Sequence, residues 1–421
     1  MEVDGLRKDT LPELIEAAPD DTTRRVIEIR QELSRTSTKK YDTMRKAVCR
    51  DGRVRGLFQF YGASRTGRWA GRLVQVQNLP RNYIKDLAGV REMLKAGHVD
   101  MIETLYGSLP DTLSQLIRTA IVPPPGKKFI VSDFSAIEAR VIAWMAGEDW
   151  RLKVFRGHGK IYEASAAAMF GVPMEQIHKG HPLRQKGKIA ELALGYGGSN
   201  GALIAMGALN MGLTEDELPE LVAKWREANP AIVRYWHWVE KQMVGALESG
   251  NVRKIIAKVH DPAYAAENED RTHAPGGLYT DLFDAPGAPV LWAKPRKNEL
   301  SVKLPSGREL FYSKARLEMD ERFNKPCITY LDNNGRTNTY GGKLVENIVQ
   351  AVARDCLAEG IKRIHAAGYR IVMHVHDEVV IEADTDTTVD EINDLMGEAI
   401  EWAPGLPMDA DGFECEFYQK D

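Results

Sequence analysis

The sequence predicts an α+β protein, in which helix-forming and strand-forming segments occupy separate stretches of the chain. Residues 150–250 show the apolar spacing of helices almost throughout. Residues 300–340 instead hold short strand-like runs, separated by turn-forming sequences at 305–307 and 333–335. Runs of helices followed by runs of strands are typical of α+β folds rather than of alternating βα units.

The length and composition are those of a soluble globular protein. A chain of 421 residues corresponds to roughly two to three domains. No apolar run approaches the ~18 residues that a membrane span needs, and the N-terminus lacks the core of a signal peptide. We therefore expect a cytoplasmic protein with no membrane partner. The four cysteines form no Cys-x-x-Cys pair, which predicts reduced, buried thiols without a zinc site or a disulfide framework.

Charge is segregated along the chain, although its net value is only -4. Residues 24–85 hold sixteen Lys and Arg against four acids, whereas residues 377–421 hold fifteen acids against one Lys. A basic segment of this density can neutralise a run of nucleic-acid phosphates. A solvated basic face is the alternative that composition alone leaves open.

The N-terminal part is expected to be helical around one basic loop. Helices are predicted over 11–48 and 86–121, and a strand over 54–61 leads into the loop at 64–81. Beside its arginines and glycines, the loop carries the amides Gln75, Gln77 and Asn78. Arginines fix phosphates and amides can reach base edges, so the loop is a candidate nucleic-acid contact, with a purely structural loop as the alternative.

The stretch 129–140 is predicted to be a short buried strand that runs directly into a helix. Its apolar residues 129–131 follow a Pro- and Gly-rich breaker, and helix formers begin at Ala136. Asp133 falls where the strand should end, which is a common position for a metal ligand or a catalytic acid. On this stretch alone, a helix cap is an equally reasonable interpretation of Asp133.

One predicted helix within residues 150–250 carries a surface that changes from basic at one end to apolar and aromatic at the other. Its residues Arg184, Lys188, Leu192 and Tyr196 are spaced by four and would share one face. Two cations one turn apart suit phosphate groups, and the apolar and aromatic residues beyond them suit a base. Glycines around Tyr196 would let a partner approach the backbone; without them, an ordinary exposed stripe would be the default interpretation.

The remaining elements follow from the same periodicities. Further helices are predicted over 164–170, 183–196, 215–228, 231–247, 343–365 and 388–402. Strands are predicted over 300–304, 309–312, 328–331, 337–340, 370–375, 379–382 and 412–418. Residues 251–300 are expected to form an irregular excursion, because Pro, Gly, Asp and Asn are frequent there.

The turn His376-Asp377-Glu378 places two adjacent acids between apolar strands. Acids in such a turn are costly unless a cation compensates them, although a solvated turn is the alternative. Together, Asp133 and Asp377 are the minimum ligand set for two Mg²⁺ ions about 3.5 to 4 Å apart. Magnesium suits a site with few carboxylates when substrate phosphates supply further oxygens.

Jointly, these motifs resemble the polymerase region of family A DNA polymerases, the DNA polymerase I type, and its phage members most. The family's DYSQIELR motif is matched by residues 133–140, its Arg/Lys/Tyr-Gly motif by 184–197, and its VHDE motif by 375–378. Its upstream TGR and QN pieces are matched by residues 66–68 and 77–78. Order and spacing agree from about residue 24 to the last residue.

The resemblance implies a right-hand fold with an antiparallel-sheet palm, helical fingers and a short or truncated helical thumb. Residues 1–60 would form the thumb base and 61–148 the first part of the palm with the primer-template-binding loop. Residues 149–300 would form the fingers with the excursion, and 301–421 the second part of the palm with the catalytic hairpin. Because only about 60 residues precede the basic loop, we expect no 3′-5′ exonuclease and low processivity without a processivity or exonuclease partner.

The resemblance also implies template-directed extension of a DNA primer with dNTPs by two-metal-ion nucleotidyl transfer. Two Mg²⁺ ions, which Mn²⁺ can replace, would be held by Asp133, Asp377 and the backbone carbonyl of Phe134, with Glu378 in support. Lys188 would also act as the general acid towards pyrophosphate.

Further roles are implied for the nucleotide and the DNA. The implied nucleotide-binding residues are Arg184, Lys188, Leu192, Tyr196, Glu138 and Phe134. Among these, Tyr196 would lie at the templating base, and Glu138 would be the gate that excludes a 2′-hydroxyl. The implied DNA-binding residues are Arg68, Arg72, Gln77, Asn78, Arg140, Gln350 and His376.

Several positions depart from the family's pattern. Leu192 stands where Phe or Tyr is usual, which leaves the tolerance of 3′-deoxy sugars open. Tyr162 stands where bacterial members place a phosphate-contacting His, and Glu346 stands where an Asn contacts DNA. Ala136 and Gln75 replace a Gln and an Asn. These departures weaken the inferences about triphosphate and minor-groove contacts, but not those about the metals.

Three other functions compete with this interpretation. A single-subunit RNA polymerase shares the basic helix and the His-Asp turn, but it needs a small residue where Glu138 stands. A catalytically inactive DNA-binding accessory of the same fold would not need all the acids that are present. A metal-dependent nuclease would not need the helix that carries Arg184, Lys188 and Tyr196.

Overall fold

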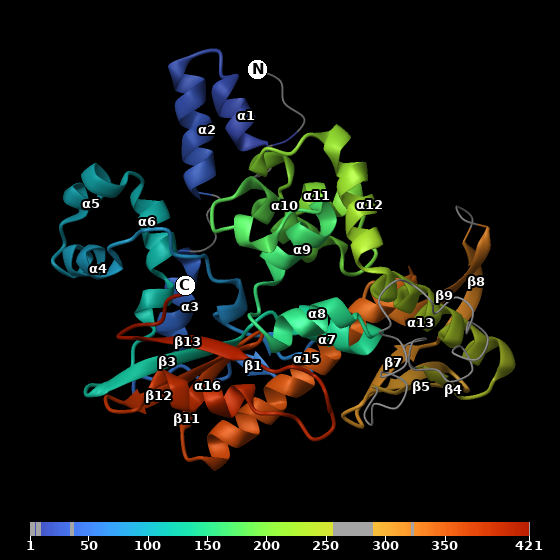
Figure 1. Ribbon diagram of the computed structural model, residues 1–421. Coiled ribbons are helices and arrows are strands. Elements are labelled where there is room, and N and C mark those ends of the chain that lie inside the picture. The colour runs from blue at the N-terminus through green and yellow to red at the C-terminus, as the bar shows by residue number, and fades with distance from the viewer. Residues whose placement is uncertain (1–4, 6–9, 34–37, 256–288, 321–323, 421) are drawn as a thin grey trace.

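The computed structural model describes residue 5 and residues 10–33, 38–255, 289–320 and 324–420 (Figure 1). Helices and antiparallel sheets occupy separate stretches of the chain, which confirms the predicted α+β class. Among these residues, no helix combines the length and the apolar character that crossing a membrane requires.

A four-stranded antiparallel sheet lies at the base of the molecule, in the order β11-β12-β3-β13 (Figure 1). Its strands are β3 (Lys127–Phe134), β11 (Arg370–Val375), β12 (Glu378–Asp384) and β13 (Ala410–Cys415). The register of β3 against β12 runs from Lys127 opposite Asp384 to Asp133 opposite Glu378. Strand β3 therefore carries Asp133 at the end where β12 begins.

Both faces of this sheet are covered. Phe129 and Val131 point to one side, where they pack with apolar residues of the 74–79 loop. Ile130 lies on the opposite face, which α15 and α16 cover. Because successive strand residues alternate sides, Asp133 points to the same side as Val131. Burial on both faces explains why the strand is apolar without alternation.

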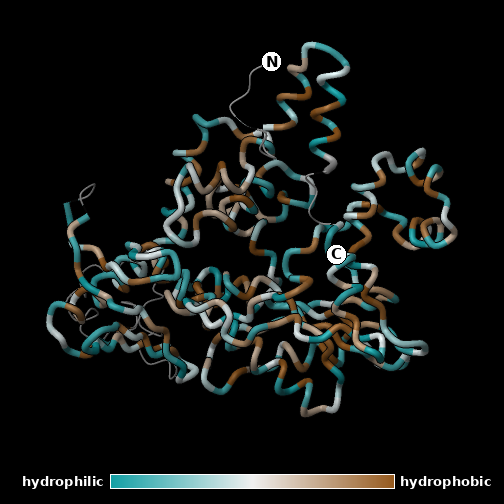
Figure 2. The backbone as a smooth tube through the Cα atoms, turned by 180° about the vertical axis from the view of Figure 1, so that it is seen from behind, coloured by the Kyte–Doolittle hydropathy of each residue, from teal (hydrophilic) through white to brown (hydrophobic). Residues whose placement is uncertain are grey.

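Helices surround the sheet and form the upper part of the molecule (Figure 1). The first three helices are α1 (Leu11–Glu16), α2 (Asp21–Leu33) and α3 (Lys39–Ala47), and the next three are α4 (Leu87–Lys95), α5 (Val99–Tyr106) and α6 (Leu109–Leu116). The central block contains α7 (Ile137–Ala146), α8 (Asp149–Arg156), α9 (Ile161–Phe170), α10 (Pro182–Leu194), α11 (Asn200–Ala205), α12 (Leu218–Ala228) and α13 (Pro230–Ser249). The helices below the sheet are α15 (Gly341–Ala366) and α16 (Val389–Gly397). Helices α1 and α2 form a projecting hairpin along which hydrophilic and hydrophobic residues alternate (Figure 2).

Three smaller antiparallel sheets complete the described fold. One contains β4 (Arg253–Ile255), β5 (Leu291–Arg296), β6 (Glu299–Lys303) and β7 (Glu309–Ser313). Another contains β8 (Arg316–Asp320), β9 (Lys325–Asp332) and β10 (Gly335–Thr339). The short pair of β1 (Phe58–Gln59) and β2 (Ala70–Gly71) brackets the first part of the basic loop.

The structure corrects several predicted elements. The strand expected over 54–61 shortens to β1, because Gly56 and Tyr61 adopt positive φ angles on either side of it. The final helix ends at Gly397, since Glu398 is already extended. The sequence did not predict β4, β5 or β8, which are short or interrupted by proline and charge.

Two further expectations have mixed outcomes. Cys49 is exposed, although buried cysteines were expected, while Cys327 and Cys356 are buried and all four thiols are free. Most of the irregular excursion expected over 251–300 falls on residues 256–288, which lie outside the described residues. The division of the chain into thumb, palm and fingers stays a prediction.

Candidate active site

Three carboxylates meet where β3 ends and β12 begins. Asp133 lies on β3, Glu378 is its register partner on β12, and Asp377 occupies the turn before β12. The backbone N–H of Phe134 donates to the carbonyl of Asp377, with an N···O distance of 3.4 Å. His376 in the same turn has a φ of 59°, a left-handed conformation that is uncommon outside glycine. The hairpin and the central strand thus place all three acids together.

Burial and mutual repulsion disfavour the charged forms of these acids. Burial, followed by the charges of Asp377 and Glu378, raises the pKa of Asp133 to about 8. Burial also raises the pKa of Asp377 and the pKa of Glu378. A cation that enters such a site stabilises the ionised carboxylates and reverses this preference.

Asp133 suits a cation better than it suits a helix cap. The N-cap position of α7 is Ala136, which excludes Asp133 from that role. The Oδ1 atom of Asp133 is buried and has no hydrogen-bond partner among the described residues. Buried polar atoms are nearly always satisfied, so this oxygen fits a ligand that the protein itself does not supply.

The carboxylates alone would not saturate a metal ion. Within the described residues, no group of three or more His, Cys, Asp or Glu side chains is arranged to hold one. A divalent ion at Asp133 and Asp377 would therefore need further oxygens from backbone, water or substrate.

Residues near the C-terminal end of the sequence hold the Glu378 carboxylate in place. Glu378 is 2% exposed, and the Tyr418 hydroxyl donates to its Oε1 at 2.7 Å. Arg118 in turn donates from Nη1 to the Tyr418 hydroxyl at 2.9 Å, and the Nζ of Lys420 lies 3.8 Å from Glu378 Oε2. No motif in the sequence marks Tyr418, Arg118 or Lys420, because their role depends on the segment after β13 returning to β12.

A cavity of about 310 Å³ opens between the hairpin turn and the helices α7, α9 and α10. The predicted site residues in its wall are Glu138, Leu192, Tyr196 and Asp377. Asp133, Phe134 and Glu378 line a second cavity of about 240 Å³. The fold therefore gathers residues from all three sequence motifs around one region.

Glu138 is held from two sides within the first cavity. The Tyr196 hydroxyl donates to Glu138 Oε2 at 2.9 Å, and the Arg68 guanidinium forms an ion pair with Oε1. Burial and the Glu138 charge raise the pKa of Tyr196, so its hydroxyl stays a donor. The spacing of four had placed Tyr196 on the helix, but this residue lies beyond Leu194, the last residue of α10. The sequence did not predict the contact of Arg68 with Glu138.

Arg184 and Lys188 both lie on α10 but differ in their surroundings. Arg184 donates from Nε to Glu163 Oε1 at 2.6 Å, and its guanidinium lies 5.6 Å from the centre of the Tyr162 ring. Lys188 is half-buried and has no ion-pair partner in the described part of the chain. Its ammonium group is therefore free for an anionic ligand. Arg184, in contrast, would have to divide its contacts between Glu163 and such a ligand. Glu163 has no motif that could have identified it.

The expected DNA-binding residues other than Arg140 lie around the basic loop, the hairpin turn and α15. Arg72, Asn78 and His376 are exposed, while Arg68, Gln77 and Gln350 are half-buried. The Oε1 atom of Gln77 is buried without a hydrogen-bond partner among the described residues. Their contacts with DNA stay predictions.

Arg140 contradicts its predicted DNA contact. It is 1% exposed, and its Nη2 donates to Asp409 Oδ2 at 2.9 Å. Its Nε donates to the carbonyl of Ser135 at 2.6 Å, and its guanidinium lies 4.6 Å from the centre of the Phe155 ring. Arg140 therefore holds α7 against neighbouring segments, and it is not placed to reach a ligand. The motif alone could not tell an inward arginine from an outward one.

Replacing Asp133 by Asn should stabilise the metal-free protein near pH 8. Because the pKa of Asp133 is raised from 3.8 to about 8 in the folded protein, the wild type loses stability as pH rises across this window. The variant has no such charge to bury. Its melting temperature should match the wild type near pH 4 and exceed it by about 2–4 °C near pH 8 in a chelator.

Thermal melts at several pH values, with and without Mg²⁺, measure this effect. Added Mg²⁺ should raise the melting temperature of the wild type more than that of the variant. Equal melting temperatures of the variant and the wild type at pH 8 in the chelator would contradict the predicted loss of stability on ionisation of Asp133.

Comparison with known sequences identifies relatives of the chain. The sequence profile of DNA polymerase family A matches residues 6–271. The chain is 56% identical to the DNA polymerase of Bacillus phage SP02, in an alignment that covers 100% of this chain and 61% of the phage protein. It is 30% identical to DNA polymerase I of Pseudomonas aeruginosa over 34% of this chain and 15% of that protein. The chain thus spans about three fifths of the phage relative's length.

A solved structure shows the same fold. The POL domain of Pol1 from M. smegmatis, in complex with DNA primer-template and dNTP, matches with a TM-score of 0.54 and 15% sequence identity. The match covers 99% of this chain and 57% of the other. The profile match and the identity to the phage protein agree with the motifs gathered at the site. This chain belongs to DNA polymerase family A.

Proposed function

We propose that this protein extends the 3′ end of a DNA primer with dNTPs, as a template strand directs. The observation that carries the proposal is the placement of Asp133 and Asp377 beside a cavity whose wall includes Glu138 and Tyr196. Acids for metal ions and a bounded space for a sugar and a base are what nucleotidyl transfer requires. The family assignment and the name of the phage SP02 relative support the same activity.

In the proposed reaction, the primer 3′ oxygen forms a bond to the α-phosphorus of the dNTP, and the bond from that phosphorus to pyrophosphate breaks. Asp133, Asp377 and the Phe134 carbonyl would hold two Mg²⁺ ions, which Mn²⁺ can replace. When bound, these ions polarise phosphate oxygens and lower the pKa of the attacking hydroxyl. Glu378 would keep Asp133 and Asp377 in place without binding the metal ions itself, because it is already hydrogen-bonded to Tyr418.

The helix α10 would hold the triphosphate. Lys188 is free to bind phosphate oxygens and to give a proton to the departing pyrophosphate. Arg184 would hold the outer phosphates, in part by exchanging its contact with Glu163. Leu192, which is 51% exposed, and Tyr196 would pack against the incoming sugar and the templating base.

The basic loop and α15 would hold the primer-template. Arg68 and Arg72 would neutralise phosphates or reach the minor groove, and the amides of Gln77 and Asn78 would support them. The other proposed contacts are Gln350 on α15 and His376 in the hairpin turn. Structurally, α1–α3 would form the thumb base, the sheet around β3 the palm, and α8–α13 the fingers.

Primer extension tests the proposal. A labelled primer annealed to a template with a 5′ overhang should be elongated with dNTPs in Mg²⁺, but not in EDTA. Elongation only with rNTPs would favour the RNA polymerase alternative, and degradation of the primer would favour a nuclease. A primer with a mismatched 3′ end tests the separate expectation of no 3′-5′ exonuclease, because that end should not be removed.

A further inference from the structure

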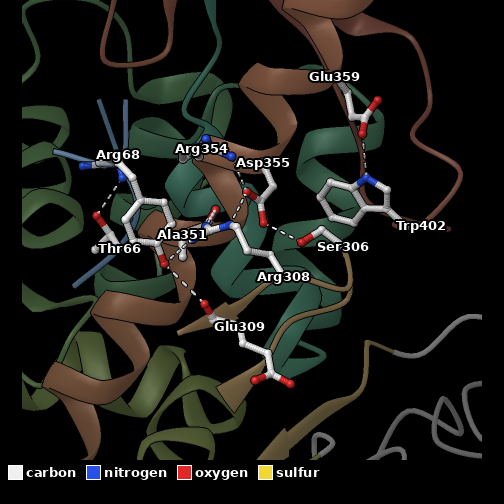
Figure 3. A network of polar contacts seen from close by, with 11 residues as sticks. Thr66, Arg68, Ser306, Arg308, Glu309, Ala351, Arg354, Asp355, Glu359 and Trp402 are labelled. Atoms are coloured by element: carbon white, nitrogen blue, oxygen red, sulfur yellow. Dashed lines mark hydrogen bonds and ion pairs between the residues drawn. The ribbon is translucent and has the colours of Figure 1, made fainter. Parts of the chain in front are cut away.

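A buried carboxylate, Asp355 on α15, is the centre of a polar network behind the basic loop. Asp355 is 5% exposed. Its oxygens accept hydrogen bonds from Ser306 Oγ at 2.5 Å, Arg308 Nε at 2.8 Å and Arg354 Nη1 at 3.1 Å. Figure 3 shows these three side chains converging on Asp355. One carboxylate therefore fixes two guanidinium groups that would otherwise repel each other.

The first guanidinium braces one side of the loop formed by residues 60–69. Arg308 also donates from Nη2 to the carbonyl of Ala351 at 2.9 Å, which leaves its Nη1 directed at the loop. This Nη1 lies 3.4 Å from the Tyr61 hydroxyl, and the guanidinium lies 5.6 Å from the centre of the Tyr61 ring. A Cβ at Gly67, which has a φ of 73°, would collide with Arg308. The backbone of the loop thus rests directly on Arg308.

The second guanidinium braces the other side of the same loop. Arg354 is 9% exposed, and its guanidinium lies 4.3 Å from the centre of the Trp69 ring and 5.2 Å from that of Phe60. Such cation–π contacts are strongest when the cation is removed from water. Burial and repulsion from Arg308 lower the pKa of Arg354, whereas the hydrogen bond to Asp355 favours its charged form.

We infer that Asp355 is a positioning residue that, through Arg308 and Arg354, sets the direction in which Arg68 points. Arg68 lies between Gly67, which rests on Arg308, and Trp69, which stacks with Arg354. The loop is therefore braced on both sides of the residue whose guanidinium reaches Glu138. This inference rests on the proposed function, in which Arg68 contacts the primer-template.

Loss of the Asp355 charge should loosen the loop. Asp355→Asn keeps the shape of the side chain but leaves two like-charged guanidinium groups, the buried one of Arg354 and the half-buried one of Arg308, without a counter-ion, and these would move apart. We expect primer-template affinity, measured by fluorescence anisotropy, to fall about tenfold. The catalytic rate at saturating primer-template should change far less, since the metal and triphosphate residues are not touched.

A mutant cycle separates positioning from general loss of structure. In an Arg68→Ala background, Asp355→Asn should weaken binding by less than about twofold, because the residue through which it acts is gone. An equal loss in both backgrounds would overturn the inference. Should Asp355→Asn fail to fold, Arg354→Met tests the same cycle, since it removes the hydrogen bond to Asp355 together with the contacts with Phe60 and Trp69.

A matched control lies one turn further along α15. Glu359 is also a helix carboxylate, but it accepts from Trp402 Nε1 at 3.2 Å, away from the loop (Figure 3). Glu359→Gln should leave primer-template affinity unchanged. If the wild type binds no primer-template, the proposed function fails; if it binds and Asp355→Asn binds equally well, only the role of Asp355 is overturned.

Discussion

Asp133→Asn should lower the rate of primer extension by about a thousandfold or more and leave primer-template affinity within about twofold. The amide cannot supply the negative charge that holds a divalent ion, and loss of several kcal/mol of transition-state stabilisation corresponds to such a factor. Binding should persist because the residues proposed to contact the primer-template, such as Arg68 and Gln350, are unchanged in this variant. Asp377→Asn should have the same effect.

Single-turnover extension and anisotropy with the same labelled primer-template measure the two quantities. Asp384→Asn is the matched control, because Asp384 lies at the far end of β12, where it pairs with exposed Lys127. Its extension rate should equal that of the wild type. Extension by Asp133→Asn at half the wild-type rate or more would refute the metal-ligand role and would revive the interpretation as an inactive accessory protein.

Glu138→Ala should raise the efficiency of ribonucleotide incorporation, relative to deoxyribonucleotides, by about 10- to 100-fold. A contact that excludes one hydroxyl contributes about 1–3 kcal/mol to discrimination, which corresponds to this range. Because the Tyr196 hydroxyl and the Arg68 guanidinium hold the Glu138 carboxylate in place, its position in the cavity is defined before a nucleotide enters. Alanine would remove this obstacle.

Steady-state extension with one dNTP or the matching rNTP measures the ratio of kcat/KM values. Glu138→Gln is the informative control, since it keeps the volume of the side chain and its contact with Tyr196, so selectivity should be largely retained. Unchanged selectivity in Glu138→Ala would remove Glu138 from the role of sugar gate. A wild type that prefers rNTPs would instead favour an RNA polymerase.

Much of the secondary structure and the identity of the acids followed from local patterns. The strand that ends near Asp133, the helix after it and the hairpin around Asp377 were predicted because apolar periodicity, breakers and turn residues act over a few neighbours. The element ends were less secure. The last helix is shorter than its apolar pattern, and Tyr196 lies outside the helix to which its spacing assigned it.

The sequence by itself thus determined the α+β class, the family and the acids that a metal-dependent reaction would use. Only the tertiary structure decided which charged side chains face inward. Arg140 and Arg68 look alike in sequence, yet Arg140 is buried against Phe155 and Asp409, while Arg68 forms an ion pair with Glu138 in the cavity wall. The physical reason is that burial and ion pairing depend on segments that meet only after folding, as Asp355 meets Arg308 and braces the loop that carries Arg68.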